Sequence, residues 1–464
     1  MSSLLSYKSS VFPTPHIQKI PDALDYDGVV NSETLNAHLN LLINFKALEQ
    51  NIPLMDMRYL LRAQERYILW LQLLEKCNEN CEKDFISIPP IDVCYIWHAH
   101  CLSPFKYCED MLRLYPTLLK HNFPLQKLNH IWNSGSNFVD KKSQKIWEEF
   151  TGTPWVLDAS DKSEFTIIRP WCNTSNKINP DSYVKIMKEK SMNQYCVNCS
   201  AELSADTLSV KRFYDNIEKF QIEQKPIVAG TLLNTRTGEY GPAISLKECS
   251  ILFSETNFKM LSETNFKMLS ETIFGKIYLK KFHWNVVLSD IMRVAKRLRK
   301  KKQLKNIRQL TISRIIASYK DIPFPFSIDL IDAVLRQREF TNKMVERSWD
   351  SPGKCHVPTL DIDLGWHTYM LYPPLYRSFT SKLTSRIINH DDTIPRPTLK
   401  EALTFTAKAW YEKYQETYTV EDPSDYTARI QKKKTYLKFN GAHLIWKVKN
   451  IREKMEGLDV VLSA

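Results

Sequence analysis

Glycine is scarce in this sequence, with 11 residues among 464. That scarcity excludes collagen-like chains and glycine-rich low-complexity chains. Hydrophobic residues make up 43% and charged residues 25% of the chain, which are ordinary proportions for a folded globular protein. The length exceeds the size at which a single hydrophobic core usually stops growing, so we expect two or three packed units.

Long hydrophobic runs are also absent. No stretch approaches the roughly 18 apolar residues of a membrane-spanning helix, and the first 20 residues lack the charged and apolar segments of a secretory signal. Ten cysteines are too few to build a disulfide scaffold in a chain of this length. We therefore expect no membrane span, reduced thiols, and a cytoplasmic or nuclear location.

The signature motifs of several large enzyme classes are missing. The sequence contains no Walker loop, no G-x-G-x-x-G, no G-x-S-x-G and no H-E-x-x-H. Nucleotide-dependent chemistry and the common hydrolase chemistries therefore have no motif to support them.

Two segments of the chain resemble each other. Residues 88–107 read IPPIDVCYIWHAHCLSPFKY and residues 357–376 read VPTLDIDLGWHTYMLYPPLY, and they align without a gap at a constant offset of 269. Seven of the 20 positions are identical, including a Trp-His pair and two prolines. Apolar residues recur at helical spacing before each copy, at 57–77 and 327–349. An internal duplication that produced two related helical units accounts for this pattern.

The overall pattern predicts a mainly α fold with a smaller mixed α/β region. Between the two units, β-branched stretches alternate with turn residues, which is typical of short strands. We divide the chain into an N-terminal extension (1–34), helical unit 1 (35–158), a mixed α/β region (159–285), a basic amphipathic helix (286–322), helical unit 2 (323–420) and a basic, helical C-terminal tail (421–464).

The repeated motif places a tryptophan directly before a histidine, at 97–98 and at 366–367, and we call it the W-H motif. Prolines before the first copy and Pro104 after it favour a three-turn helix followed by a bend. On a helix, positions two apart differ by about 200°, so His98 and His100 would point to opposite faces and could not share a metal ion. In a strand they would share one face, and a common metal site would become feasible.

Carboxylates near these histidines allow two interpretations. Asp363 lies one helical turn before His367, and such a pair can act as a base with its orienting carboxylate or as two metal ligands. Alternatively, the two groups satisfy each other at a helix junction beside a packed tryptophan. Because Tyr369 replaces the second histidine in copy two, we favour the structural interpretation. The motif residues concerned are Asp92, Trp97, His98, His100, Asp361, Asp363, Trp366 and His367.

Positive charge is concentrated in one segment. The formal net charge is +12, and residues 291–320 contain 11 Lys or Arg and no Asp or Glu, which leaves 12 − 11 = +1 for the rest. The segment has the spacing of an amphipathic helix, which can bind nucleic acid, act as an import signal, contact calmodulin or a membrane surface, or present a solvated basic face. The candidates for contact with RNA are Arg293, Lys296, Arg297, Arg299, Lys300, Lys301, Lys302 and Lys305.

One pair of cysteines has a spacing found in zinc sites. Cys196 and Cys199 form a C-x-x-C, which is half of a structural zinc site, and Cys172 and Cys249 are available to complete it. Reduced loop thiols and redox chemistry are the alternatives. We predict no cofactor beyond this zinc candidate.

As a set, these motifs resemble the glycine-rich domain-containing protein family of plants and fungi, which carries a domain of unknown function. The pattern P-x-x-D-x-x-x-x-W-H-x-H-x-L-x-P-x-x-Y, present twice, is similar to the conserved motif of that family, and the resemblance extends over about residues 35–430. It includes Cys196-Val-Asn-Cys199, similar to a C-P-x-C element, Gly230-Thr-Leu-Leu, similar to a G-T-L element, and His390-Asp391-Asp392, similar to an H-D-D element.

The resemblance implies little about activity. Plant members are associated with stress and development and with proposed RNA-binding segments, and some fungal members are labelled 2-oxoglutarate-dependent dioxygenases. That chemistry requires two histidines and one carboxylate around iron, for which His367, His390 and either Asp391 or Asp363 are candidates. This sequence departs from the family in Tyr369 and in lacking a Cys-rich stretch and a glycine-rich tail, which puts a metal site of the motif histidines in doubt.

We therefore expect a non-enzymatic interaction or regulatory protein, with RNA, another acidic molecule or a protein as its partner. The alternative is a metal-dependent enzyme of the non-haem iron oxygenase type, centred on the W-H motifs. Metal content separates these two hypotheses.

Overall fold

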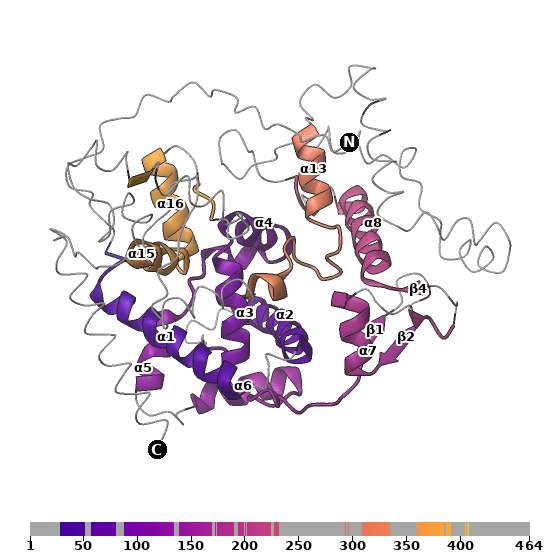
Figure 1. Ribbon diagram of the computed structural model, residues 1–464, viewed down its shortest axis with the longest axis horizontal. Coiled ribbons are helices and arrows are strands. Elements are labelled where there is room, and N and C mark those ends of the chain that lie inside the picture. The colour runs from indigo at the N-terminus through magenta and orange to yellow at the C-terminus, as the bar shows by residue number, and fades with distance from the viewer. Residues whose placement is uncertain are drawn as a thin grey trace, which may run out of the picture.

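The computed structural model is mainly α-helical, with two small two-stranded sheets beside the helices (Figure 1). The predicted fold class is confirmed. The structure describes residues 28–51, 57–79, 88–133, 139–168, 172, 174–189, 194–198, 200, 202–223, 227–231, 293, 296, 309–334, 360–384, 387–390, 404, 406 and 407.

The first part of the described chain is a group of packed helices. Its elements are α1 (Ser32–Asn51), α2 (Met57–Glu79), α3 (Ile91–Cys101), α4 (Pro104–Leu114), the 3-10 helix η2 (Pro116–Lys120), α5 (Leu125–Asn133) and α6 (Lys141–Thr151). The first W-H motif lies on α3, so the predicted helix is confirmed and the strand alternative is wrong. Pro90 immediately precedes α3 and Pro104 begins α4 after a two-residue bend, because proline fits a helix start and not its interior.

The mixed region follows the first helices. Its elements are β1 (Phe165–Ile168), β2 (Ser175–Ile178), α7 (Pro180–Val184), the π-helix η3 (Lys185–Glu189), β3 (Gln194–Tyr195), β4 (Glu202–Leu203) and α8 (Ala205–Glu223). β1 pairs with β2 and β3 pairs with β4, both antiparallel. In β1, buried and exposed residues alternate, as expected for a strand with one face on the core.

The second W-H motif forms the same pair of helices as the first. After α13 (Gln309–Ala317), the described chain contains α15 (Leu360–Met370) and α16 (Pro373–Thr384). Both bounds of α15 and the first residue of α16 follow those of α3 and α4 by 269 positions, the offset of the sequence alignment. In each copy the tryptophan indole N–H donates to the tyrosine hydroxyl ten residues later, at 3.4 Å in the first and 2.9 Å in the second. These matches agree with an internal duplication.

The two helix pairs also meet through equivalent residues. A small cavity between α4 and α16 is lined by Cys101, Pro104, Tyr107 and Cys108 of the first copy, by Met370, Pro373, Tyr376 and Arg377 of the second, and by Leu119. Each of the first four positions differs from its counterpart by 269. The guanidinium of Arg377 donates to the sulfur of its own counterpart, Cys108, at 3.2 Å. Such pairing is what an approximate internal two-fold axis between the copies produces.

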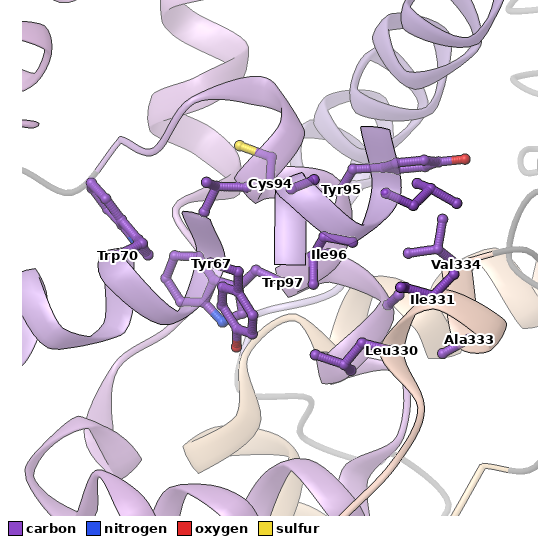
Figure 2. Packing of buried hydrophobic residues seen from close by; sticks show 14 of the residues in the cluster. Tyr67, Trp70, Cys94, Tyr95, Ile96, Trp97, Leu330, Ile331, Ala333 and Val334 are labelled. Atoms are coloured by element: carbon purple, nitrogen blue, oxygen red, sulfur yellow. The ribbon is translucent and has the colours of Figure 1, made fainter. Parts of the chain in front are cut away.

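The main core surrounds α3. Figure 2 shows Tyr67 and Trp70 of α2, residues 94–97 of α3 and Leu330, Ile331, Ala333 and Val334 of a later segment packed together. Every residue of α3 from Asp92 to Cys101 is buried. Removing each large apolar side chain from water contributes roughly 1.5–3 kcal/mol, but polar side chains on such a helix must find partners inside the protein.

This buried cluster draws residues from several of the segments that we predicted as separate units, including β1, β2 and residues 324–334. The six-segment division stays a prediction. The N-terminal extension up to residue 27, the tail from residue 421 and most of the basic helix lie outside the described residues. Within the described part of the chain, no helix has the length and hydrophobicity needed to cross a membrane.

Candidate metal centre at the W-H motifs

Asp92 forms a buried ion pair at the start of α3. Its carboxylate lies 2.6 Å from Nε of Arg66, and both side chains are at most 5% exposed. The same guanidinium donates to the carbonyl oxygens of Pro154 and Trp155 at 2.8 and 2.6 Å. Burial raises the pKa of Asp92, although Arg66 opposes the shift. Asp92 therefore ties α3 to α2 and to the loop after α6, and it is not directed at either W-H histidine.

His100 belongs to a polar cluster of its own. Its Nδ1 lies 3.1 Å from the hydroxyl of Tyr67, and its Nε2 lies 3.3 Å from a carboxylate oxygen of Asp110. In the second copy, Tyr369 and Phe379 occupy the positions equivalent to His100 and Asp110, and their rings pack with centroids 5.1 Å apart. An aromatic pair thus replaces a polar pair, so the loss of this histidine in the second copy is compensated by packing.

His98 faces away from His100, toward α1. Its Nε2 lies 2.9 Å from Nε2 of His38, and Nδ1 of His38 lies 2.8 Å from the hydroxyl of Thr368. The Thr368 hydroxyl donates to the carbonyl of Leu364 at 2.7 Å, so it must accept from Nδ1–H of His38. Neutral His38 then accepts at Nε2, and His98 donates its Nε2–H. Burial lowers the pKa of His38 to about 3, which keeps its ring neutral at pH 7.

His367 forms a second imidazole pair. Its Nε2 lies 3.0 Å from Nε2 of His390 and 3.4 Å from a carboxylate oxygen of Asp363. Nδ1 of His390 donates to the carbonyl oxygen of Leu102 at 2.9 Å, which leaves Nε2 of a neutral His390 as a lone-pair donor. The indole of Trp366 packs edge-on against His390, with centroids 5.0 Å apart, and fixes the ring further.

The two imidazole pairs connect the two W-H motifs reciprocally. His98 of the first motif pairs with a histidine that is held by Thr368 of α15. His367 of the second motif pairs with a histidine that is held by Leu102, just after α3. Each motif therefore orients the histidine that serves the other motif, and α1, α3, α15 and residues 387–390 are joined in one buried network.

Asp363, His367 and His390 have the geometry of three ligands of one metal ion. One ligand atom from each residue can be chosen so that all three lie within 4.8 Å of one another. With metal–ligand bonds of about 2.1 Å, ligands at octahedral and tetrahedral angles lie about 3.0 and 3.4 Å apart, and two of the separations here are 3.0 and 3.4 Å. The first motif has Cys94 where the second has Asp363, and the Cys94 thiol donates to Pro89 instead.

Two properties of this candidate centre favour a cation: the buried His367 ring is neutral, and the Asp363 carboxylate is in contact with solvent. The pKa of His367 lies well below its ordinary value because of burial first and then the nearby rings of His390, His38 and His98. A neutral imidazole is the form that binds metals. The Asp363 side chain is 18% exposed and that of His367 is 1% exposed, so solvent reaches the cluster from the carboxylate side.

Only some of the other candidate residues from the sequence lie in the described part of the chain. Asp361 lies on α15, but its side chain is outside the described residues, as are Asp391 and Cys199. Cys196 is buried. Arg293 and Lys296 are helical and exposed, while Arg297, Arg299, Lys300, Lys301, Lys302 and Lys305 are outside the described part of the chain.

His38 and Thr368 belong to the histidine network but were not predicted from the sequence. Thr368 follows the W-H pair directly, and its place on the buried face of α15 was a usable signal. His38 lies 60 residues before its partner, and no spacing rule connects positions that far apart.

Part of this chain is similar to known proteins. Residues 40–110 match the family described as "Glycine-rich domain-containing protein-like"; the match includes the first W-H motif and ends before the second. The chain is similar to glycine-rich domain-containing protein 1 of Arabidopsis thaliana, with 34% identity over 95 residues, and to protein 2 of that plant, with 28% over 134. These matches cover 20% and 28% of this chain but only 11% and 16% of the relatives. No solved structure matches. The resemblance indicated by the repeated motif is confirmed: residues 40–110 of this chain are similar to the glycine-rich domain-containing protein-like family.

Proposed function

We propose that this protein binds a divalent transition-metal ion through Asp363, His367 and His390. The observation that carries the proposal is the 3.0 Å approach of two imidazole nitrogens beside a carboxylate. His390 supports it because its other nitrogen donates to the Leu102 carbonyl, the arrangement that fixes the tautomer and orientation of metal-binding histidines.

The donor set indicates which ions fit. Two imidazoles and one carboxylate suit iron, zinc and other first-row divalent ions, and this ligand set is the one found in non-haem iron oxygenases. A bound ion there would supply Lewis-acid or oxygen chemistry at its open positions. These residues would hold the ion between α15 and residues 387–390, and the hydrogen bond of His390 to Leu102 would connect it to the end of α3.

Metal binding is measured on the full-length protein after chelation and anaerobic reloading with Fe(II), Co(II) or Zn(II). We expect Asp363→Asn to bind the ion at least about 100-fold more weakly, because even outer partners of metal ligands typically contribute 10–100-fold. The asparagine keeps the size of the side chain and removes its charge. His98→Asn is the matched control, since it disrupts the equivalent imidazole pair of the first motif.

The outcomes are distinct. Loss of one metal equivalent in Asp363→Asn and its retention in His98→Asn supports the proposal. Equal metal content in the wild type and Asp363→Asn overturns it, and the imidazole pair is then a hydrogen bond within the core.

A second candidate function is binding to RNA or another polyanion through the basic helix. The supporting observation is that Arg293 and Lys296 are helical, exposed and three residues apart, so they lie on one face. Phosphate contacts of this kind are independent of sequence and weaken with salt.

Filter binding of single-stranded RNA at several salt concentrations tests this function. Replacing Arg293 and Lys296 with glutamine should reduce the slope of log K against log salt by about 1.4, since each contact to a single strand contributes about 0.7. Lys145→Gln on the exposed face of α6 is the control. An unchanged slope in the double variant removes these two side chains from any RNA contact.

A further inference from the structure

Two cysteines from different hairpins meet in the mixed region. Cys172 lies in the loop between β1 and β2, and Cys196 directly follows β3 of the second hairpin. Their sulfur atoms are 3.6 Å apart. Neither cysteine forms a disulfide, and Cys196 is buried while Cys172 is half-buried. Each hairpin therefore contributes one sulfur to the same place, although 24 positions separate them in the chain.

The separation of the sulfurs fits a shared zinc ion. Zinc binds thiolates at about 2.3 Å in tetrahedral sites, which places neighbouring sulfurs about 3.8 Å apart. A disulfide would require about 2.05 Å. The observed 3.6 Å is within a few tenths of an ångström of the zinc spacing and far from the disulfide spacing.

The buried side chain of Asn176 supports this arrangement. The two N–H groups of its Nδ2 are shared among the carbonyls of Ile167 and Thr174 and the sulfur of Cys196, which lies 3.7 Å away, while its Oδ1 accepts from the backbone N–H of Val197. Asn176 is 3% exposed. One amide thus fastens the two loops together and lies beside the sulfur, the position that an outer partner of a metal ligand occupies.

The chain turns sharply after Cys196. The N–H of Ser200 donates to the carbonyl of Cys196 at 2.9 Å, and Ser200 has a φ of 54°, a left-handed conformation that is uncommon for serine. Cys196 is also the first residue of the C-x-x-C, a spacing common in zinc sites. Cys199 lies outside the described residues.

We propose that Cys172 and Cys196 are two ligands of a structural zinc ion that joins the two hairpins. The binding step exchanges two thiol protons for one Zn²⁺, without a change in oxidation state. This site is separate from the Asp363–His367–His390 centre, because thiolates supply its donor atoms. It does not depend on the function proposed above.

Zinc content of the full-length protein, measured by elemental analysis, tests the proposal. We expect Cys172→Ser and Cys196→Ser each to lose one equivalent of zinc. Cys77→Ser is the matched control, since Cys77 is another half-buried cysteine that forms no disulfide, and this variant should keep that equivalent. Asp363→Asn should also keep it, so a failure of the proposed function and a failure of this inference are distinguishable.

Two measurements on the unmutated protein guard against variants that fail to fold. A mercurial reagent that blocks thiols should release the zinc to a colorimetric indicator, and cobalt substitution should produce a thiolate-to-cobalt charge-transfer band. If thiol blocking releases no zinc, the proposal is overturned. An intact mass two hydrogens below that of the reduced chain, with the thiols protected from alkylation, also overturns it in favour of a disulfide.

Discussion

Lowering the pH from 7.5 to 5 should destabilise the metal-free protein through His38. Burial lowers the pKa of this ring from 6.5 to about 3 in the folded state. The unfolded chain takes up a proton near pH 6.5 and the folded chain does not, so stability is complete above that pH and falls as the pH decreases toward 3. At pH 5, which is about 1.5 units below the unfolded-state pKa, proton binding to the unfolded chain lowers the free energy of unfolding by about 2 kcal/mol through this one group.

Urea unfolding at pH 7.5 and pH 5 in the presence of a chelator measures this loss. His38→Asn should be less stable than the wild type at pH 7.5, because its partners His98 and Thr368 lose a hydrogen bond. Its further loss on going to pH 5 should be about 2 kcal/mol smaller. His130→Asn, at an exposed position of α5, should leave the pH dependence unchanged. If His38→Asn loses as much stability as the wild type, the buried neutral ring is not the cause.

Two further predictions concern stability. Asp92→Ala should lower the free energy of unfolding in urea by about 3–5 kcal/mol, because it leaves the buried Arg66 guanidinium without its carboxylate. Asp181→Ala, which breaks a largely exposed ion pair, should lower it by under about 1 kcal/mol. Similar losses in the two variants would contradict the assignment of Asp92 as a buried anchor. Gly230→Ala should lower the melting temperature more than Gly152→Ala, although both glycines have positive φ. A Cβ at Gly230 would approach the backbone of α13 to 2.6 Å, whereas no described atom apart from the chain neighbours of Gly152 lies within 4 Å of a Cβ added there. Equal shifts would show that the conformation alone matters.

Local structure at the W-H motifs followed directly from the sequence. Proline cannot occupy a helix interior, so the prolines on either side of the first motif left room for about three turns, and α3 spans Ile91–Cys101. The same argument transferred to α15 through the constant offset. Sequence spacing also separated His98 from His100, because the direction of a side chain on a helix depends only on its position.

The composition of the candidate centre was accessible only in part. The one-turn spacing of Asp363 and His367 was visible in the sequence, and the family resemblance drew attention to His390. His390 is held beside His367 of α15 by its hydrogen bond to the carbonyl of Leu102, 288 residues away in the sequence. Local propensities carry no information about such contacts, since tertiary packing decides them. The same limit applied to the thiols, where spacing alone left Cys172 and Cys249 equivalent.

The reciprocal histidine network has a consequence for the part of the chain that matches the family. Residues 40–110 contain His98, which is fully buried, but they contain neither His38 nor Thr368, and they do not contain His390, which donates to the Leu102 carbonyl. Within that segment alone, Nε2 of His98 and the carbonyl of Leu102 would lack these partners, and an unsatisfied buried polar group costs about 1–3 kcal/mol. Because a domain's net stability is typically only about 5–15 kcal/mol, residues 40–110 should depend on His38 of α1 and on α15 for their fold. The two motifs are therefore better regarded as halves of one buried structure than as two independent modules.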